Sequence, residues 1–277
     1  MNEADYGYLK KRIHRAIGIN LDDYKATQMM RRLDGFILRT GLPGVVPYCG
    51  LLEHDRAEQL RLRDFLTINV SEFYRDVNQF ETLRTVILPQ LLANNRNLSI
   101  WSAGCSDGQE PYTVAILLNE LPGCGRTRIL ATDIDRASLD RAMQGGPYKP
   151  SEMKSLPRSL VEKYFTARPD GYHLNETIHR QVAFKQHNLM QDPFESNFDL
   201  IICRNVVIYF SIEAKQRLMV RFFHSLTDKG ILFIGATESM LNAEVLGFQR
   251  IFPCFYRKPA TSPIQPAVPL TVQAVRR

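Results

Sequence analysis

The sequence predicts an α/β protein with a doubly wound, mostly parallel sheet, an N-terminal helical domain and a small antiparallel β-subdomain. Three observations carry this prediction. From residue 97 onward, short apolar runs alternate with helical segments. Residues 3–67 lack strand-like alternation and space their apolar residues as a helix does. A Pro-Asp-Gly turn at 169–171, between aromatic and apolar neighbours, indicates a short antiparallel excursion from the sheet.

The N-terminal segment is predicted to form three or four short helices, because its apolar residues recur at helical spacing and glycines separate the runs. The clearest helical spacing is that of Met29, Met30, Leu33, Phe36 and Ile37, and the punctuating residues are Gly18 and the stretch 41–44.

The strands of the sheet are predicted from four apolar runs, and the intervening segments supply the helices that connect parallel strands. Between the second and third runs, "YFTARPDGYHLNETIHRQVAFKQHN" (164–188) is expected to form the antiparallel excursion, seated on the sheet. The four runs are "LSIWSA" (98–103), "RILATDID" (128–135), "FDLIICRN" (198–205) and "GILFIGATE" (230–238).

Composition excludes several classes of protein. The 277 residues are 44% hydrophobic, no apolar run reaches the length of a membrane span, and the N-terminus is charged where a signal peptide would be apolar. The five cysteines include no Cys-x-x-Cys pair, so neither a disulfide framework nor a zinc site is indicated. We expect a soluble, cytoplasmic protein with reduced thiols and no metal.

The net charge of +6 is concentrated at the two ends of the chain. Residues 1–39 carry eight Lys or Arg against five Asp or Glu, and residues 257–277 carry four Lys or Arg and no acid. A basic N-terminal segment favours an acidic partner, and a solvated helix face is the alternative interpretation. The candidate cations of such a basic face are Lys25, Arg31, Arg32 and Arg39.

The stretch "IWSAGCSDGQEPYT" (100–113) predicts a ligand-binding turn after the first strand. Gly104 to Gly108 would form the turn, and Glu110 and Pro111 the first turn of the next helix, where proline is favoured. Glycines at this edge of an open sheet let the backbone approach a ligand. The spacing is not the dinucleotide Gly-x-Gly-x-x-Gly, and a glycine-rich turn alone does not define the ligand.

The charges around this turn favour one class of ligand. Asp133 ends the next strand, 29 residues after Gly104, where a carboxylate can accept both hydroxyls of an adenosine ribose. Capping of the following helix is the alternative role for Asp133 or Asp135. Asp107 and Glu110 would repel a pyrophosphate, whereas an uncharged ribose and a cationic sulfonium suit them. S-Adenosylmethionine therefore fits the turn better than NAD.

Five motifs follow one another along the chain: "TINVSEFYRD" (67–76), "IWSAGCSDGQEPYT" (100–113), "ILATDID" (129–135), "KQHNL" (185–189) and "LIICRNVVIYF" (200–210). In order and spacing they resemble those of the bacterial chemotaxis receptor glutamate methyltransferases, the CheR family, over residues 5 to 258. The resemblance implies a Rossmann-like class I methyltransferase, with S-adenosyl-L-methionine as cofactor and S-adenosyl-L-homocysteine as product.

The resemblance also implies a domain organisation. An α-helical receptor-recognition domain would span 1–68, and a linker contributing to the cofactor site would span 69–80. The methyltransferase domain would span 81–258, with the β-subdomain inserted at about 164–187. The proline-rich tail, 259–277, has little to pack and is expected to be disordered.

The expected site residues follow from the resemblance and from the turn. The candidate catalytic residues are Arg75, whose planar fork can hold the incoming carboxylate or the cofactor, and Tyr209, which the resemblance places near the methyl-transfer point. An ion pair with Asp76 or Glu72 is the alternative role for Arg75. The expected cofactor-binding residues are Asn69, Ser71, Arg75, Gly104, Glu110, Asp133, Asn188, Leu189, Arg204 and Asn205.

The expected reaction is methylation of glutamate side chains on bacterial chemoreceptors, which serves chemotactic adaptation. A glutamate carboxylate, with a pKa near 4.3, is already ionised and nucleophilic at neutral pH, so no general base is required. The four strand runs hold no histidine, and the six histidines show no metal-ligand spacing. Positioning and exclusion of water would then supply most of the catalysis.

Two other functions remain open from the residues alone. The basic N-terminus admits a nucleic-acid methyltransferase, although the strand end "CRNVVIYF" (203–210) lacks the (Asp/Asn/Ser)-Pro-Pro-aromatic stretch typical of amino-group methylation. A non-catalytic S-adenosylmethionine-sensing adaptor is the second alternative.

The expected partners are the cytoplasmic helices of methyl-accepting chemotaxis receptors, with no nucleic acid and no membrane insertion. Family members that bind a peptide at the receptor C-terminus carry a glycine-rich insertion in the loop of the β-subdomain. Here that loop is only "ARPDGYHLNE" (167–176), so we expect no peptide tether. We expect the protein to be a monomer.

Overall fold

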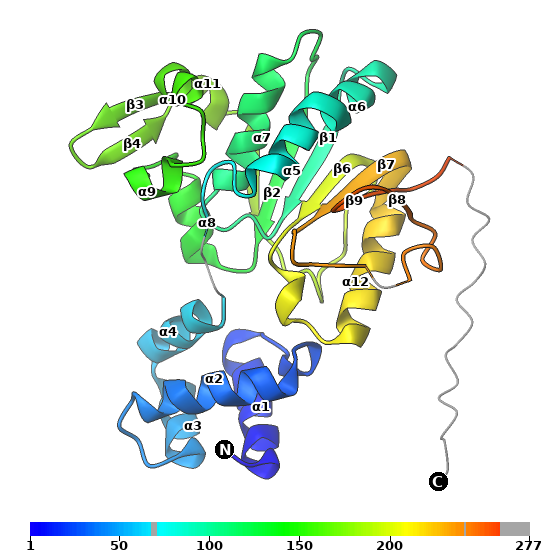
Figure 1. The fold of residues 1–277 in the computed structure, drawn as a ribbon. Helices are drawn as coiled ribbons and strands as arrows, with labels where there is room; N and C mark the ends of the chain where they lie inside the picture. Colours follow the sequence, from blue (N-terminus) through cyan, green and yellow to red (C-terminus); the bar gives the residue numbers. More distant parts are fainter. Residues whose placement is uncertain (68–70, 241, 261–277) are drawn as a thin grey trace.

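The computed structural model describes residues 1–67, 71–240 and 242–260. Figure 1 shows a helical module, residues 1–67, lying beneath an α/β body built around a seven-stranded sheet. Within the described residues, no helix is both long enough and apolar enough to cross a membrane. The predicted proline-rich tail falls largely on 261–277, outside the described residues.

Four helices form the helical module: α1 (Glu3–Ile17), α2 (Ala26–Leu38), α3 (Val45–His54) and α4 (Arg56–Leu66). Met29, Leu33 and Phe36 of α2 are buried in its core, so the predicted helical spacing marks the buried face of this helix. Gly18 ends α1 in the left-handed region, with φ 74°, and its N–H donates to the His14 carbonyl. Glycine is favoured there because it has no Cβ to strain that conformation.

The sheet of the α/β body has the strand order β5-β2-β1-β6-β7-β9-β8. Its first five strands in this order are parallel, and β9 runs antiparallel to β7 and β8. The fold-class prediction of a mostly parallel sheet is confirmed. The strands are β1 (Ser99–Ala103), β2 (Arg128–Asp133), β5 (Val182–Gln186), β6 (Phe198–Cys203), β7 (Leu226–Ile234), β8 (Gln249–Phe252) and β9 (Phe255–Arg257).

Helices cover both faces of this sheet, as in a doubly wound fold (Figure 1). Trp101 and Ser102 are neighbours in β1, so their side chains point to opposite faces. Trp101 packs against Phe222 of α12 (Ile212–Ser225), with ring centroids 5.5 Å apart. Ser102 donates to Glu110 of α7 (Gln109–Glu120) on the other face, at 2.8 Å. The chain enters β1 through α5 (Val77–Thr82), a π-helical turn (Leu83–Ile87) and α6 (Leu88–Asn94).

The antiparallel excursion is smaller than the sequence analysis predicts. It holds only the two-stranded sheet of β3 (Phe165–Arg168) and β4 (Gly171–Leu174). Strand β5, which the analysis places in the excursion, instead pairs in parallel with β2 at the edge of the main sheet. An edge strand has a neighbour on one side only and tolerates polar residues, so "VAFKQ" lacks the continuous apolar run of a central parallel strand.

Short helices surround this excursion and complete the left-hand part of the body in Figure 1. They are α8 (Arg136–Ala142), α9 (Pro150–Met153), α10 (Arg158–Tyr164) and α11 (Glu176–His179).

Candidate cofactor site

One cavity of about 370 Å³ lies at the carboxyl edge of β1, β2 and β6 and reaches the helical module. Loops at this edge face the ligand crevice in open α/β sheets. Asn69, which the sequence analysis also places here, lies outside the described residues. The structure brings the other expected site residues together around this cavity: Ser71, Arg75, Gly104, Glu110, Asp133, Asn188, Leu189, Arg204, Asn205 and Tyr209.

The turn after β1 approaches the cavity with its backbone. The N–H groups of Gly104 and Cys105 both donate to the Thr132 carbonyl, at 2.8 and 3.0 Å, which ties the turn to the end of β2. Gly104 has φ 88°, and a Cβ at this position would lie 2.4 Å from a Val206 methyl group. Only glycine therefore fits this turn without displacing the neighbouring loop.

Asp133 faces the cavity and braces the same turn. Its Oδ2 accepts the Ser106 N–H at 2.8 Å, and its Oδ1 accepts the Asp135 N–H at 2.9 Å. Asp135 instead caps α8 by accepting the Ala137 N–H at 3.0 Å, which resolves the alternative that the sequence left open. Burial raises the pKa of Asp133, although the backbone N–H bonds lower it in part.

Arg204 is a buried counter-ion, with 2% of its side chain exposed. It pairs with Asp76 at 2.7 Å and with Glu110 at 3.3 Å, and it also donates to the Arg75 carbonyl at 2.8 Å. Its guanidinium lies over the rings of Phe80 and Phe233, 4.9 and 4.8 Å from their centroids. Burial raises the pKa of Glu110, an effect that Arg204 opposes.

The two acids beside Arg75 each pair with another cation. Asp76 pairs with Arg204, and Glu72 pairs with Lys154 at 2.9 Å. Arg75 lines the main cavity and also a second, adjoining cavity, so it stands at the boundary between the two.

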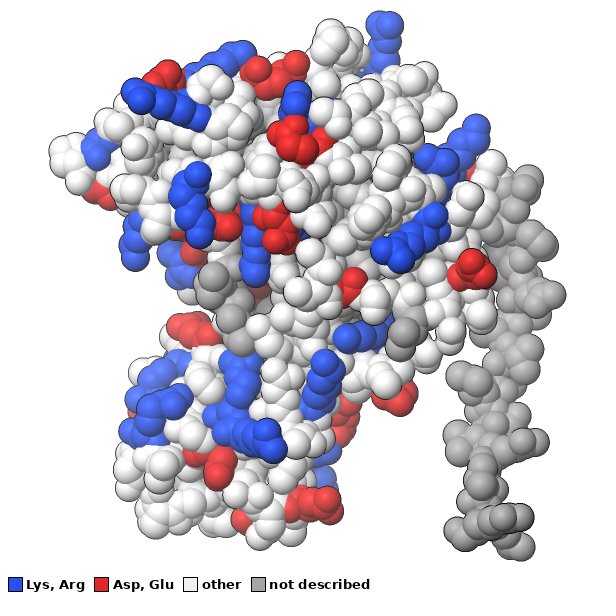
Figure 2. All heavy atoms as spheres, in the orientation of Figure 1, with Lys and Arg blue, Asp and Glu red and all other residues white. Residues whose placement is uncertain are grey.

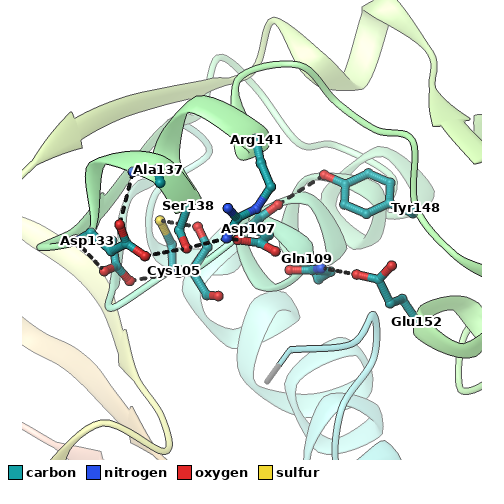
Figure 3. Close-up of polar contacts among 11 residues, drawn as sticks. Cys105, Asp107, Gln109, Asp133, Ala137, Ser138, Arg141, Tyr148 and Glu152 are labelled. Atoms are coloured by element: carbon teal, nitrogen blue, oxygen red, sulfur yellow. Dashed lines mark hydrogen bonds and ion pairs between the residues drawn. The ribbon is translucent and has the colours of Figure 1, made fainter. Parts of the chain in front are cut away.

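The second cavity is lined by Asp107 of the β1 turn together with Arg141 and Tyr148, which Figure 3 labels. Arg141 of α8 pairs with Asp107 at 2.8 Å, and the Tyr148 hydroxyl donates to the Asp107 carbonyl at 3.2 Å. Gln109 donates to Glu152 of α9 at 2.7 Å. Asp107 therefore points away from the main cavity, and its charge is matched by Arg141.

Asn188 and Leu189 follow β5 in a tight turn. The Asn188 side chain accepts the Met190 N–H at 2.9 Å, and its own N–H donates to Asp192 at 2.8 Å. His187, beside them, is 5% exposed and packs edge-on against Trp101, and burial lowers its pKa. A packing role suits this histidine.

The helical module supplies part of the cavity wall, which sequence reasoning missed. Tyr24 lines the cavity and forms an antiparallel bridge with Phe210, their rings 5.1 Å apart. The Lys25 N–H donates to the Tyr209 carbonyl at 3.0 Å. Arg32 points inward, with its guanidinium 5.8 Å from the Tyr209 ring centroid, and so differs from the expected outward basic face. No local pattern in residues 20–32 signals these contacts.

The polar side chains that line the cavity suit S-adenosylmethionine. Glu110 and Glu72 are each paired with a cation, whereas Asp133 has no ion pair among the described residues, so its carboxylate can accept the hydroxyls of a ribose. The buried Ser106 hydroxyl has no hydrogen-bond partner among the described residues and lines the cavity, where a polar ligand can satisfy it.

Comparison with known proteins gives a consistent result along the chain. Residues 69–251 match the CheR methyltransferase SAM-binding domain, and residues 4–67 match the CheR methyltransferase all-alpha domain. A chemotaxis protein methyltransferase of Listeria innocua is 36% identical over 260 residues, covering 92% of this chain and 98% of the relative. One from Borreliella burgdorferi is 34% identical over 264 residues, covering 90% of this chain and 92% of the relative.

Proposed function

Because the chain belongs to the CheR methyltransferase family, we propose that it transfers a methyl group from S-adenosylmethionine to glutamate side chains of chemoreceptors. The products are glutamate γ-methyl esters and S-adenosylhomocysteine. The cofactor, when bound, supplies an electrophilic methyl group on its sulfonium.

The described residues act by positioning. The substrate carboxylate is ionised at neutral pH and needs no base to activate it. Asp133 and the turn at Gly104 are suited to hold the adenosine end, and Arg75 and Tyr209 line the same cavity where the carboxylate must arrive. Tyr24 and Phe210 close the cavity on the side of the helical module and reduce access of water.

The observation that carries the choice of an anionic substrate is the Arg32 guanidinium, which lies 5.8 Å from the centroid of the Tyr209 ring. The neighbouring Lys25 ties the helical module to the same segment, because its backbone N–H donates to the Tyr209 carbonyl. A positive charge beside Tyr209 favours an approaching carboxylate over an amine.

The helical module carries a basic surface that suits an acidic receptor helix. Figure 2 shows Lys and Arg side chains gathered on the viewed face of the helical module. Lys25, Arg31 and Arg39 are exposed, and we define them as the basic face. We assign residues 1–68 to receptor recognition and 81–258 to methyl transfer, and we expect a monomer that needs no receptor peptide on the β3–β4 hairpin.

The product class tests the proposed reaction. Receptor is incubated with methyl-labelled cofactor, and the pH is then raised, because carboxyl methyl esters hydrolyse in mild alkali and release methanol. Volatile label is the expected result. The Asp133→Asn variant serves as the control and should give little. Label that resists alkali, or that appears on nucleic acid, would overturn the proposal.

Ionic strength and charge reversal test the docking surface. Arg31→Glu and Arg39→Glu should lower the rate on receptor, and added salt should do the same to the wild type, while cofactor affinity stays constant. Arg158→Glu is a matched control, because this arginine is exposed on α10, far from the basic face. Receptor truncated at its C-terminus should be methylated as well as the full-length receptor.

A further inference from the structure

Glu238 carries a buried carboxylate that methyl transfer does not use. It ends the run "GILFIGATE", whose first five residues belong to β7 and whose last four received no role in the sequence analysis. Glu238 is 7% exposed. The nearest arginine of the adjoining loop, Arg204, directs its charge to Asp76 and Glu110 instead. A buried carboxylate must be satisfied by some set of donors, so its partners indicate its role.

Those partners are backbone N–H groups. Oε2 of Glu238 accepts the Gly235 N–H at 2.7 Å and the Asn205 N–H at 3.1 Å. Oε1 has no hydrogen-bond partner of normal geometry among the described residues, but the N–H groups of Val207 and Ile208 face the carboxylate closely enough to lower its pKa. The Glu238 N–H donates to the Gly235 carbonyl at 3.0 Å, which closes a backbone turn over residues 235–238.

The loop that Glu238 holds, residues 204–210, is here named the cofactor loop. Six of its residues line the main cavity, the exception being Val207. Asn205 has φ 60°, a left-handed conformation that needs support from its surroundings. Val206 fills the space where a Cβ of Gly104 would stand, so the position of this loop also sets its fit against the β1 turn.

We propose that Glu238 is a positioning residue that fixes the cofactor loop in its cofactor-binding conformation through the backbone N–H group of Asn205. Glu238 does not line the cavity and acts only through the loop. The proposal concerns cofactor binding and is independent of the receptor substrate.

The first test is Glu238→Gln, which keeps the size of the side chain but removes its charge, so the remaining amide oxygen accepts the Asn205 and Gly235 N–H groups more weakly. The dissociation constant for S-adenosylhomocysteine, measured by calorimetry, should rise about tenfold. The Michaelis constant for S-adenosylmethionine should rise in parallel, with a smaller change in kcat. Glu244→Gln is the matched control, because this glutamate is exposed in the same segment and should bind like the wild type.

Gly235→Ala perturbs the same contact from the opposite side. Its Cβ would lie 2.7 Å from the Glu238 carboxylate and 3.0 Å from the Asn205 nitrogen, so the carboxylate must move. This variant should also weaken binding, and the double variant should be less impaired than the product of the two single effects. It decides the question if Glu238→Gln fails to fold.

Wild-type affinity in a folded Glu238→Gln or Gly235→Ala variant would overturn the proposal. So would an affinity loss that vanishes when the variants are assayed far below their melting temperatures, since Glu238 would then be merely structural. Because the titration contains no receptor, its outcome is separate from that of the methyl-ester experiment.

Discussion

Replacing Asp133 with asparagine is expected to weaken cofactor binding more than it weakens the fold. The carboxylate accepts two backbone N–H groups, from Ser106 and Asp135, and it faces the cavity at the end of β2. Asparagine keeps the shape and one acceptor oxygen. Alanine is a poorer choice, because it would leave both buried N–H groups without their partner.

The expected magnitudes follow from these contacts. Loss of a charged acceptor for the ribose hydroxyls costs about 1.5–3 kcal/mol, a reduction in affinity of about tenfold to hundredfold. In the free protein, one of the two N–H groups meets an NH₂, at a cost of about 1–3 kcal/mol. Burial raises the pKa of Asp133, so the neutral asparagine also removes an unfavourable buried charge and offsets part of that cost.

Calorimetric titration with S-adenosylhomocysteine and a melting curve on the same preparation measure the two effects. Asp140→Asn is the matched control, since Asp140 is an exposed acid of α8 that pairs with Arg136 at 2.9 Å. A folded Asp133→Asn protein with wild-type affinity would remove Asp133 from the site and refute the reasoning.

Three other predictions address the same site. Gly104→Ala should reduce S-adenosylhomocysteine affinity in calorimetry more than tenfold and lower the melting temperature, because its Cβ would lie 2.4 Å from Val206. Gly123→Ala is the control, since Gly123 has a similar positive φ but open space around it, and it should cost only about 1–2 kcal/mol of stability. Arg75→Ala should lower the methylation rate on receptor at least tenfold. The melting temperature should change little, because the backbone carbonyl of residue 75, which accepts from Arg204, is retained. Equal activity with a lower melting temperature would make Arg75 structural. In calorimetric titrations, the affinities for S-adenosylmethionine and S-adenosylhomocysteine should both fall as the pH drops through the raised pKa of Asp133, because a protonated carboxyl is a weaker acceptor for the ribose hydroxyls that both ligands carry. Over that range the free protein should gain stability as the pH falls, because folded Asp133 binds its proton more tightly than unfolded Asp133 does, and a melting series checks this sign.

Periodicity predicted the elements whose burial is uniform. The central strands β1, β6 and β7 are nearly continuous apolar runs because both faces are covered, and α2 shows a one-sided apolar face because one face is buried. Strand β5 escaped this reasoning. It lies at the edge of the sheet, where the polar side chains of Lys185 and Gln186 are tolerated. Its pairing with β2 depends on the tertiary fold and cannot be predicted from the apolar pattern of β5 itself.

The motifs predicted which residues would meet, but not how their charges would be shared. Glu110 and Arg204 were both expected at the cofactor, and the structure pairs Arg204 with Glu110 and also with Asp76. This pairing brings together three segments that are distant in the sequence, so it cannot be predicted from the local sequence of any one of them. The contribution of Tyr24 was missed for the same reason, since it reaches the cavity only through its bridge to Phe210.

The cofactor loop is where these separate constraints combine. Its Val206 occupies the space that Gly104 leaves open, its Asn205 N–H is held by Glu238, and its Tyr209 carbonyl accepts the Lys25 N–H. A displacement of the loop at one of these contacts should therefore change the other two contacts, because a packed interior deforms little. Since Lys25 belongs to the proposed receptor-docking surface, docking and cofactor binding should be coupled reciprocally, and receptor should change cofactor affinity by the same factor as cofactor changes receptor affinity. Titrating each ligand in the presence of the other measures both factors, and no change in either titration would show that the loop does not link the two surfaces.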